Sequence, residues 1–377
     1  MGGTVRDLIR RRSFRDLDFT VEGDAAALAR LWAGREGFRA GAQSEFGTIA
    51  VETPAGRIDF APSRGERYSH PAALPEVFPA PIETDMLRRD FSVNAMAYCL
   101  VGPRKGKLLD PAAGRRDITS GLLRMLHPDS ALDDPTRAYR AARYTVRLGF
   151  AVERRTRGWI SAARAAGAFD RLSGDRRRRE ISRILEQRPW EGIQALEGLG
   201  LIETILPALS AGRSTARRFE KAAAALRRLV RERRSTGALF VWAADLDGPA
   251  LCALSRRLAL PPPDSGALER LAAHRESAPR LARRPASEIA ASVESWSEET
   301  LIAVTSVLRR SEAQPLARER SRARRLRLSI AGRDLLAAGM APGPAVGRAL
   351  DRTRAARLDR EIDRSQELAY ALLQARQ

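Results

Sequence analysis

The 377-residue chain carries 66 Lys and Arg residues against 46 Asp and Glu, a formal charge of +20, and all but three of the basic residues are arginines. Such a surface attracts polyanions, so nucleic acid is the expected partner. Two cysteines and three separated histidines exclude a disulfide framework, a zinc ribbon and a histidine-based metallohydrolase. No apolar run reaches the roughly 20 residues of a membrane span. Residues 1–16 contain no apolar signal region, so we expect no membrane partner and a cytosolic location.

A small α+β head is predicted for residues 1–117. Polar and apolar residues alternate there in short runs, as they do in half-buried strands, and turn-forming residues separate the runs. In chain order we expect a strand over 16–21, a helix over 25–32, a hairpin of strands 46–52 and 57–62, and an irregular proline-rich loop over 70–82.

Helices are predicted for the remainder of the chain. After Gly121 glycine and proline become rarer, and Ala, Leu and Arg recur with the 3.6-residue period of a helix, for example over 137–148 and 176–185. Breaks are expected at 198–200, 261–263 and 342–344. The prediction is an α+β head over 1–117 followed by all-helical segments over 118–200 and 201–377.

The first residues of the chain suggest phosphate and metal chemistry. Paired glycines, Gly2 and Gly3, let backbone amides approach a phosphate closely, and Arg6 adds a charged donor. Asp16 and Asp18 are two residues apart on the predicted strand, so both carboxylates emerge on the same face. There they can hold two Mg²⁺ ions for displacement at phosphorus. A pair of this kind is also common on a solvated strand face, and a double glycine is often only a turn.

A third carboxylate would complete such a site. Asp59 lies on the second strand of the predicted hairpin, where a neighbouring strand can bring it beside Asp16 and Asp18. The alternative interpretation of Asp59 is a surface residue of the strand.

The segment 2–18 resembles the head motif GGxVRDxLLGRxxxDxD of the class II tRNA nucleotidyltransferases and the related bacterial poly(A) polymerases. The resemblance implies a polymerase-beta-like head with a mixed sheet and catalytic roles for Asp16 and Asp18. Arg10 and Arg11 replace the usual leucine and glycine. The family also has a short strand before the double glycine, so either the natural start lies upstream or the sheet lacks one strand.

A second motif, RRDFSVNAMA over 88–97, is similar to the family's RRDFTxNAMA. In the family this motif contacts the nucleotide sugar, which implies ribose or phosphate contacts for Arg89, Asp90 and Asn94. The alternative is a buried structural network, because apolar residues alternate through the segment.

A third motif, over 133–143, resembles the family's EDPxRxxRAARF. The resemblance implies that Asp134 and Arg137 select the base of CTP or ATP without a nucleic-acid template, since a carboxylate and a forked donor match the edges of C and A. Arg140 and Arg143 continue this series at intervals of three and are expected to contact the nucleotide too. Asp134 precedes a proline, so an N-cap is the competing interpretation.

The later segments resemble the family more loosely. They are 110–124 between head and neck, 175–185, 199–209 and the tail motif 330–344. The resemblance assigns base selection to a helical neck over 118–200 and tRNA binding to a body and tail over 201–377. The arginine-rich stretch 318–327 suits contacts with the tRNA backbone.

The predicted function is a Mg²⁺-dependent, template-independent tRNA nucleotidyltransferase that adds CCA, or its terminal A, to the tRNA 3′ end from CTP and ATP. The loop 70–82 occupies the position of the family's flexible loop, which accompanies A addition, so an enzyme that adds only CC is disfavoured. The alternatives are a poly(A) polymerase and a non-catalytic RNA-binding protein on the same scaffold. The oligomeric state stays open.

Overall fold

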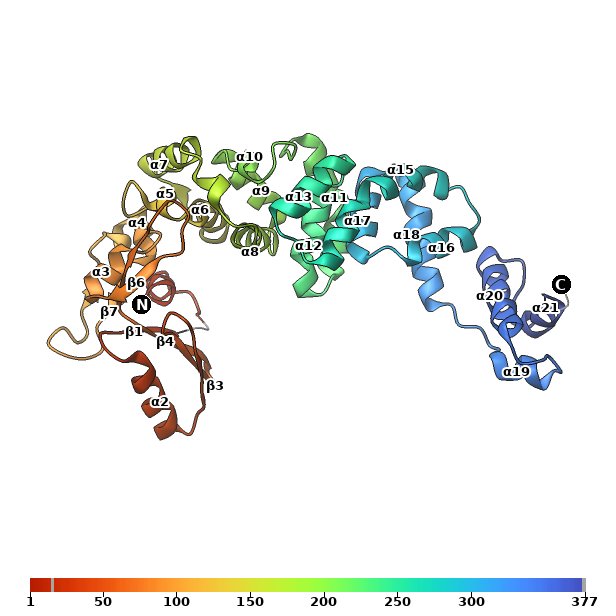
Figure 1. The fold of residues 1–377 in the computed structure, drawn as a ribbon, viewed down its shortest axis with the longest axis horizontal. Helices are drawn as coiled ribbons and strands as arrows, with labels where there is room; N and C mark the ends of the chain where they lie inside the picture. The colour runs from red at the N-terminus through yellow and green to blue at the C-terminus, as the bar shows by residue number, and fades with distance from the viewer. Residues whose placement is uncertain (15–16, 375–377) are drawn as a thin grey trace. The chain divides into compact units, whose positions relative to one another are not determined.

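The computed structural model describes residues 1–14 and 17–374. The chain divides into two compact units (Figure 1). Unit 1 comprises residues 1–184 and 191–204, and unit 2 comprises residues 185–190 and 205–377. The three-part division at 117 and 200 stays a prediction.

The head of unit 1 contains a four-stranded mixed sheet in the order β1-β4-β3-β2. Its strands are β1 (Leu17–Val21), β2 (Ala40–Gln43), β3 (Ile49–Thr53) and β4 (Gly56–Pro62). Figure 1 labels the strands β1, β4 and β3. β1 runs parallel to β4, and the other two pairs are antiparallel. The predicted strand and hairpin are confirmed, apart from Asp16, which lies outside the described residues.

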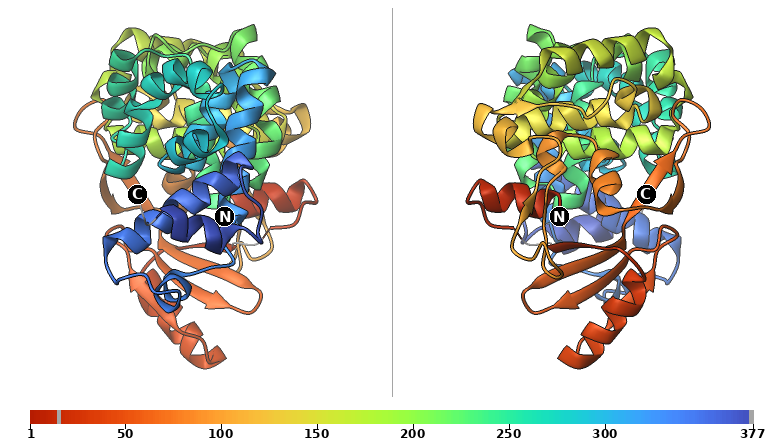
Figure 2. Two further views of the ribbon diagram at one scale, coloured as in Figure 1. Left: turned by 90° about the vertical axis from the view of Figure 1, so that its right-hand side faces the viewer. Right: turned by 90° about the vertical axis from the view of Figure 1, so that its left-hand side faces the viewer.

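Helix α2 (Ala25–Glu36) packs on one face of this sheet (Figure 2). Its small alanines let the helix approach closely, and they form a core with Ile49, Val51 and Phe60 of the sheet. The helix extends four residues beyond the predicted end and ends at Gly37, whose φ of 73° is the left-handed conformation of a helix C-cap.

The remaining elements of the head are short. They are α1 (Gly3–Ile9), β5 (Arg64–Arg67), β6 (Glu76–Pro79), α3 (Ile82–Leu87), a 3₁₀ turn η1 (Ser92–Asn94), β7 (Ala97–Tyr98), β8 (Leu108–Leu109) and α4 (Gly114–Ser120). The prediction of an irregular loop throughout 70–82 is wrong for residues 76–79, because β6 pairs antiparallel with β5, and for Ile82, where α3 begins. Pro79 is tolerated since it lies at the end of an edge strand.

Helices dominate the rest of unit 1. The elements there are β9 (Leu122–Leu123), α5 (Ser130–Asp133), α6 (Thr136–Leu148), β10 (Ala151–Val152), α7 (Arg154–Ala165), η2 (Ala168–Arg171), α8 (Gly174–Leu185), α9 (Pro189–Gly198) and α10 (Ile202–Ile205). The two-residue strands β9 and β10 pair in parallel, a small departure from the all-helical prediction.

In its described part, residues 205–374 of unit 2 contain helices and no strand. The helices are α11 (Arg213–Arg228), α12 (Arg231–Trp242), α13 (Gly248–Arg257), α14 (Pro262–Glu269), α15 (Leu271–Leu281), α16 (Ala286–Glu294), α17 (Glu298–Val307), α18 (Arg310–Arg325), α19 (Gly332–Ala337), α20 (Pro344–Asp359) and α21 (Glu367–Gln374). Among the described helices, none combines the length and apolar character of a membrane span. The α+β fold class, a mixed-sheet head followed by helices, is confirmed.

Candidate active site

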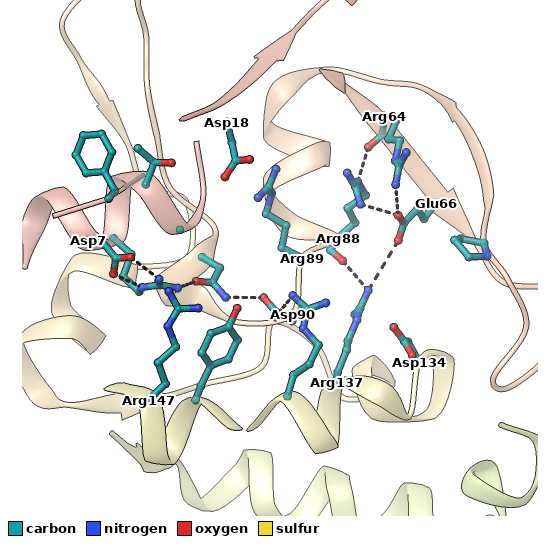
Figure 3. A pocket seen from close by; sticks show the side chains of 18 of the residues that line it. Asp7, Asp18, Arg64, Glu66, Arg88, Arg89, Asp90, Asp134, Arg137 and Arg147 are labelled. Carbon is teal, nitrogen blue, oxygen red and sulfur yellow. Dashed lines mark hydrogen bonds and ion pairs between the residues drawn. The ribbon is translucent and has the colours of Figure 1, made fainter. Parts of the chain in front are cut away.

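A cavity of about 790 Å³ lies in unit 1 (Figure 3). Residues from α1, the segment before β1, β1 itself, β5, the turn around η1 and helix α6 line it. Seven arginines and five carboxylates face this space: Arg6, Arg64, Arg88, Arg89, Arg137, Arg140 and Arg147 with Asp7, Asp18, Glu66, Asp90 and Asp134. The excess of arginine favours an anionic ligand.

The double glycine begins α1 at the cavity wall. Gly2 has φ 73°, a conformation that strains other residues, and a Cβ there would lie 2.6 Å from Nη1 of Arg89. Gly3 lines the cavity, whereas Gly2 is not among the lining residues. The double glycine therefore allows the backbone to turn past Arg89 into the helix.

Arg6 is buried and held in one orientation. Its Nε and Nη2 donate to the two carboxylate oxygens of Asp7 at 2.9 and 2.8 Å, and Nη1 donates to Oδ1 of Asn94 at 2.6 Å. Burial disfavours the charged guanidinium, but the bonds to Asp7 outweigh it and raise the pKa of Arg6. The charged guanidinium of Arg6 is therefore held in a fixed position on the cavity wall.

The candidate metal ligands lie on the neighbouring strands β1 and β4. Asp18 is exposed and lines the cavity, and Asp59 is its partner in the parallel register. Asp59 itself is not among the lining residues, and its Oδ1 accepts from Nε of Arg57 at 2.9 Å. Asp16 lies outside the described residues. Carboxylates on adjacent strands are the hard ligands that Mg²⁺ prefers, so Asp18 and Asp59 fit the ion in type. Among the residues with assigned positions, no group of three or more His, Cys, Asp or Glu side chains gathers as a metal site.

Asp90 and Asn94 form a buried network between the head and α6. Asn94 Nδ2 donates to Asp90 Oδ1 at 2.9 Å, and Arg140 pairs with Asp90 Oδ2 at 2.6 Å. Burial opposes ionisation of Asp90, but Arg140 and the hydrogen bonds outweigh it and hold its pKa below the usual range. The structure thus places both side chains in a structural network that also lines the cavity. Arg89 lines it too and donates to Asp85 Oδ2 at 3.2 Å.

Helix α6 presents four side chains to the cavity, Arg137, Arg140, Tyr144 and Arg147. Their spacing of three, four and three residues follows one face of a helix with 3.6 residues per turn. Arg143 is not a lining residue, because a strict interval of three drifts off this face. Its Nη1 lies 3.5 Å from Oε2 of Glu180, and its guanidinium lies over the ring of Tyr144.

Arg137 is fixed by groups from three elements. Its Nη1 donates to Ser130 Oγ at 2.8 Å, and its Nη2 donates to the carbonyl of Arg88 at 2.7 Å. Glu66 Oε2 lies 3.9 Å away and accepts from the Tyr68 hydroxyl at 2.9 Å. Burial is the main reason that the pKa of Tyr68 is raised, so the phenol stays a neutral donor.

Asp134 serves the start of α6 and also lines the cavity. Its Oδ1 accepts from the backbone N–H of Thr136 at 3.0 Å and from the Thr136 hydroxyl at 2.6 Å. Arg176 Nη2 donates to the same oxygen at 2.8 Å. The bounds of α6 put Pro135 at the N-cap position, one residue after the predicted N-cap Asp134, although the Asp134 side chain does accept from the first turn of the helix. Asp134 also lies at the same end of the cavity as Arg137 (Figure 3).

Sequence reasoning missed several lining residues, among them Phe14, Arg64, Glu66, Tyr68 and Arg147. Arg64, Glu66 and Tyr68 alternate along β5 and its end, a pattern typical of one strand face. Arg147 could have been found by continuing from Arg137 along the helix face at intervals of three and four. No comparable signal marked Phe14.

The amino-acid sequence of this chain is similar to those of known proteins. Residues 1–124 match the family described as the poly A polymerase head domain. Over 211 residues the chain is 39% identical to the A-adding tRNA nucleotidyltransferase of Geobacter sulfurreducens, an alignment that covers 55% of this chain and 24% of that protein. The chain thus spans about a quarter of that relative's length.

Solved structures extend the similarity to nearly the whole chain. An apo structure of a CCA-adding enzyme superposes with a TM-score of 0.83 at 27% identity, covering 99% of this chain and 90% of the other. A CCA-adding enzyme of Thermotoga maritima complexed with tRNA gives a TM-score of 0.77 at 26% identity, covering 99% and 90%.

Proposed function

We propose that this chain, which carries a poly A polymerase head domain in residues 1–124 and the fold of the CCA-adding enzymes, is a template-independent tRNA nucleotidyltransferase. It would add CCA, or the terminal A alone, to the 3′ end of tRNA from CTP and ATP and release pyrophosphate. The A-adding and CCA-adding names of its relatives support tRNA as the acceptor. The cytosolic location stays a prediction.

One observation carries the proposal: a single cavity brings together Asp18, the fixed arginines of the head and the Asp134–Arg137 end of α6. Transfer requires the 3′-hydroxyl of the RNA to attack the α-phosphorus while the bond to the pyrophosphate oxygen breaks. Catalysis of such a step is mainly positioning and neutralisation of charge. The side chains that would position the substrates and the arginines that would neutralise their charge line the same cavity.

The triphosphate would be held by the arginines nearest Gly3. Arg6 is fixed by Asp7 and Asn94, and Arg89 by Asp85, so neither has to be ordered when the ligand binds. Asp18, with Asp16 and Asp59, would hold the Mg²⁺ ions. When bound, these ions would lower the pKa of the attacking hydroxyl and stabilise the leaving pyrophosphate.

The base would be selected at the other end of the cavity. Arg137 is held by Ser130 and the Arg88 carbonyl, so its remaining donors have a fixed direction. Asp134 provides acceptors nearby. A fixed donor and acceptor pair can match the edges of C and A and leave U and G with the wrong order of groups.

Product length on defined tRNA ends tests the proposal. The substrates are tRNAs that end before CCA, after C and after CC, each with Mg²⁺ and labelled CTP or ATP. Ordered addition of C, C and A indicates the complete enzyme, A on the CC end alone indicates an A-adding enzyme, and long A tracts on any RNA indicate a poly(A) polymerase. The segment 70–82, which occupies the position of the family's flexible loop, favours products that include A.

The catalytic control is Asp16→Ala/Asp18→Ala, which should abolish incorporation. Glu45→Gln is the matched control, because Glu45 is an exposed carboxylate outside the cavity. No incorporation by the wild-type protein on any end, together with tRNA binding, would favour the non-catalytic RNA-binding alternative.

A further inference from the structure

An exposed aromatic ring lines the cavity close to the candidate metal ligands. Phe14 lies between α1 and β1 and is 40% exposed. Burying an aromatic ring is strongly favourable, so a ring left open on a cavity wall is available to a ligand with a flat apolar face. Phe14 precedes Asp18 by four residues, which limits their Cα separation to about 14 Å.

Phe14 shares the cavity with a cation that the proposed nucleotide site does not use. Arg147 is exposed, lines the cavity and, among residues 1–14 and 17–374, has no carboxylate partner. It follows Arg137 by ten residues on α6, which separates the two by about 15 Å along the helix axis. Figure 3 shows Arg147 and Asp7 at one end of the cavity and Arg137 and Asp134 at the other.

The two ends suit the two substrates of the transfer. If the base of the incoming nucleotide occupies the Asp134–Arg137 end, the RNA must bring its 3′-hydroxyl to Asp18 from elsewhere. We propose that Phe14 is the stacking platform for the 3′-terminal base of the RNA and that Arg147 binds the phosphate of that terminal nucleotide. This inference rests on the proposed function.

Stacking also fits the chemistry of successive additions. The terminal base of the acceptor changes each time a nucleotide is added, so contacts that read a particular base edge would reject some of the acceptors. An aromatic ring can stack on any base because every base has a flat π-face, and a guanidinium can contact any phosphate.

Steady-state kinetics on the tRNA end that the wild-type protein extends tests the platform. Phe14→Ala should raise KM for tRNA about 5- to 150-fold, the range of one lost base–aromatic stack. KM for the nucleotide should stay within about twofold, and Phe14→Trp should restore the KM for tRNA. Arg147→Gln should also raise KM for tRNA and lower its salt dependence.

Two variants serve as controls, Leu31→Ala for an exposed apolar residue and Arg154→Gln for an exposed arginine, both outside the cavity. A pyrrolocytidine at the acceptor's 3′ end reports stacking directly, because stacking on an aromatic ring quenches its fluorescence. Binding to the wild type should therefore lower this fluorescence, and binding to Phe14→Ala should lower it less. An unchanged KM for tRNA, or a rise in KM for the nucleotide, would overturn the inference while leaving the transfer activity intact. A wild-type protein that incorporates nothing would instead contradict the proposed function.

Discussion

Asp90 shows how a residue of the nucleotide motif also stabilises the fold. It is 4% exposed, and its carboxylate accepts from Asn94 and from the backbone of Phe91 while pairing with Arg140. Asp90→Asn would place an amide donor against a guanidinium. We expect the free energy of unfolding to fall by about 2–4 kcal/mol at neutral pH, less than for a fully buried pair because Arg140 is partly exposed.

The same variant tests the lowered pKa of Asp90. A depressed pKa in the folded state stabilises the protein above the unfolded value of about 3.9, and this contribution is lost as the pH falls toward the folded value. Urea unfolding of the wild type and Asp90→Asn should therefore differ fully above about pH 5 and converge as the pH drops below about 4. A difference that grows on acidification would contradict the pairing with Arg140.

At the residue scale, motif spacing predicted much of the site. Asp18, Arg89, Asp90, Asp134 and Arg137 all line one cavity although they come from distant segments. The spacing of the motif residues could not predict which group each side chain contacts in the folded protein. Whether an arginine on α6 faces the cavity or a neighbouring helix depends on where that helix packs, which only the tertiary structure determines.

At the element scale, α4 meets η1 through a backbone contact that only glycine permits. A Cβ on Gly114 would lie 2.2 Å from the Ser92 carbonyl oxygen. This oxygen belongs to the backbone, so the clash can be relieved only if the chain around Ser92 or Gly114 shifts. Gly114→Ala should lower the free energy of unfolding by about 1–3 kcal/mol and displace Asn94 from Arg6. Thermal or urea unfolding measures the first effect, and KM for the nucleotide measures the second.

Gly158→Ala provides the matched control. Gly158 lies within α7, is exposed and has no atom within 4 Å of its ideal Cβ. Alanine there should stabilise the protein by about 0.5–1 kcal/mol. Equal effects of the two substitutions would show that the contact between α4 and η1 contributes little.

Long elements were predictable and very short ones were not. Polar and apolar residues alternate over 16–21, and apolar residues recur with the helical period over 137–148. Both segments are long enough for the pattern to be recognised. The pairs β7–β8 and β9–β10 hold two residues per strand, too few for any period. The prolines in and around β6 hid this strand from the sequence analysis, and pairing with β5 overrides that local signal.

At the scale of the whole molecule, part of the arginine excess serves the fold. In unit 2, Arg218 donates to the carbonyls of Val241 and Trp242 near the end of α12, and Arg322 donates to those of Arg357 and Leu358 in α20. These guanidinium groups satisfy backbone acceptors that helix ends leave free. The formal charge of +20 therefore overstates the surface available to RNA.

The arginines at the end of α18 remain candidates for RNA backbone contacts. Arg325 and Arg327 are exposed, and within the described part of the chain their side chains donate to nearby backbone carbonyls. Replacing both with glutamine should reduce the slope of log affinity for tRNA against log salt by about two and leave KM for the nucleotide unchanged. Filter binding between 50 and 200 mM salt measures the slope, and an unchanged slope would place the tRNA elsewhere.

Incorporation of each of the four nucleoside triphosphates into a CC-ended tRNA tests most directly whether this cavity both transfers and selects nucleotides. We expect the wild type to incorporate A and to reject G and U. Asp18→Asn should lose at least about 100-fold in rate, as expected when a metal site is impaired. Arg137→Gln should retain transfer but lose about 10- to 100-fold in discrimination between A and the rejected bases. Transfer that survives in Asp18→Asn, or selectivity that is unchanged in Arg137→Gln, would contradict the account.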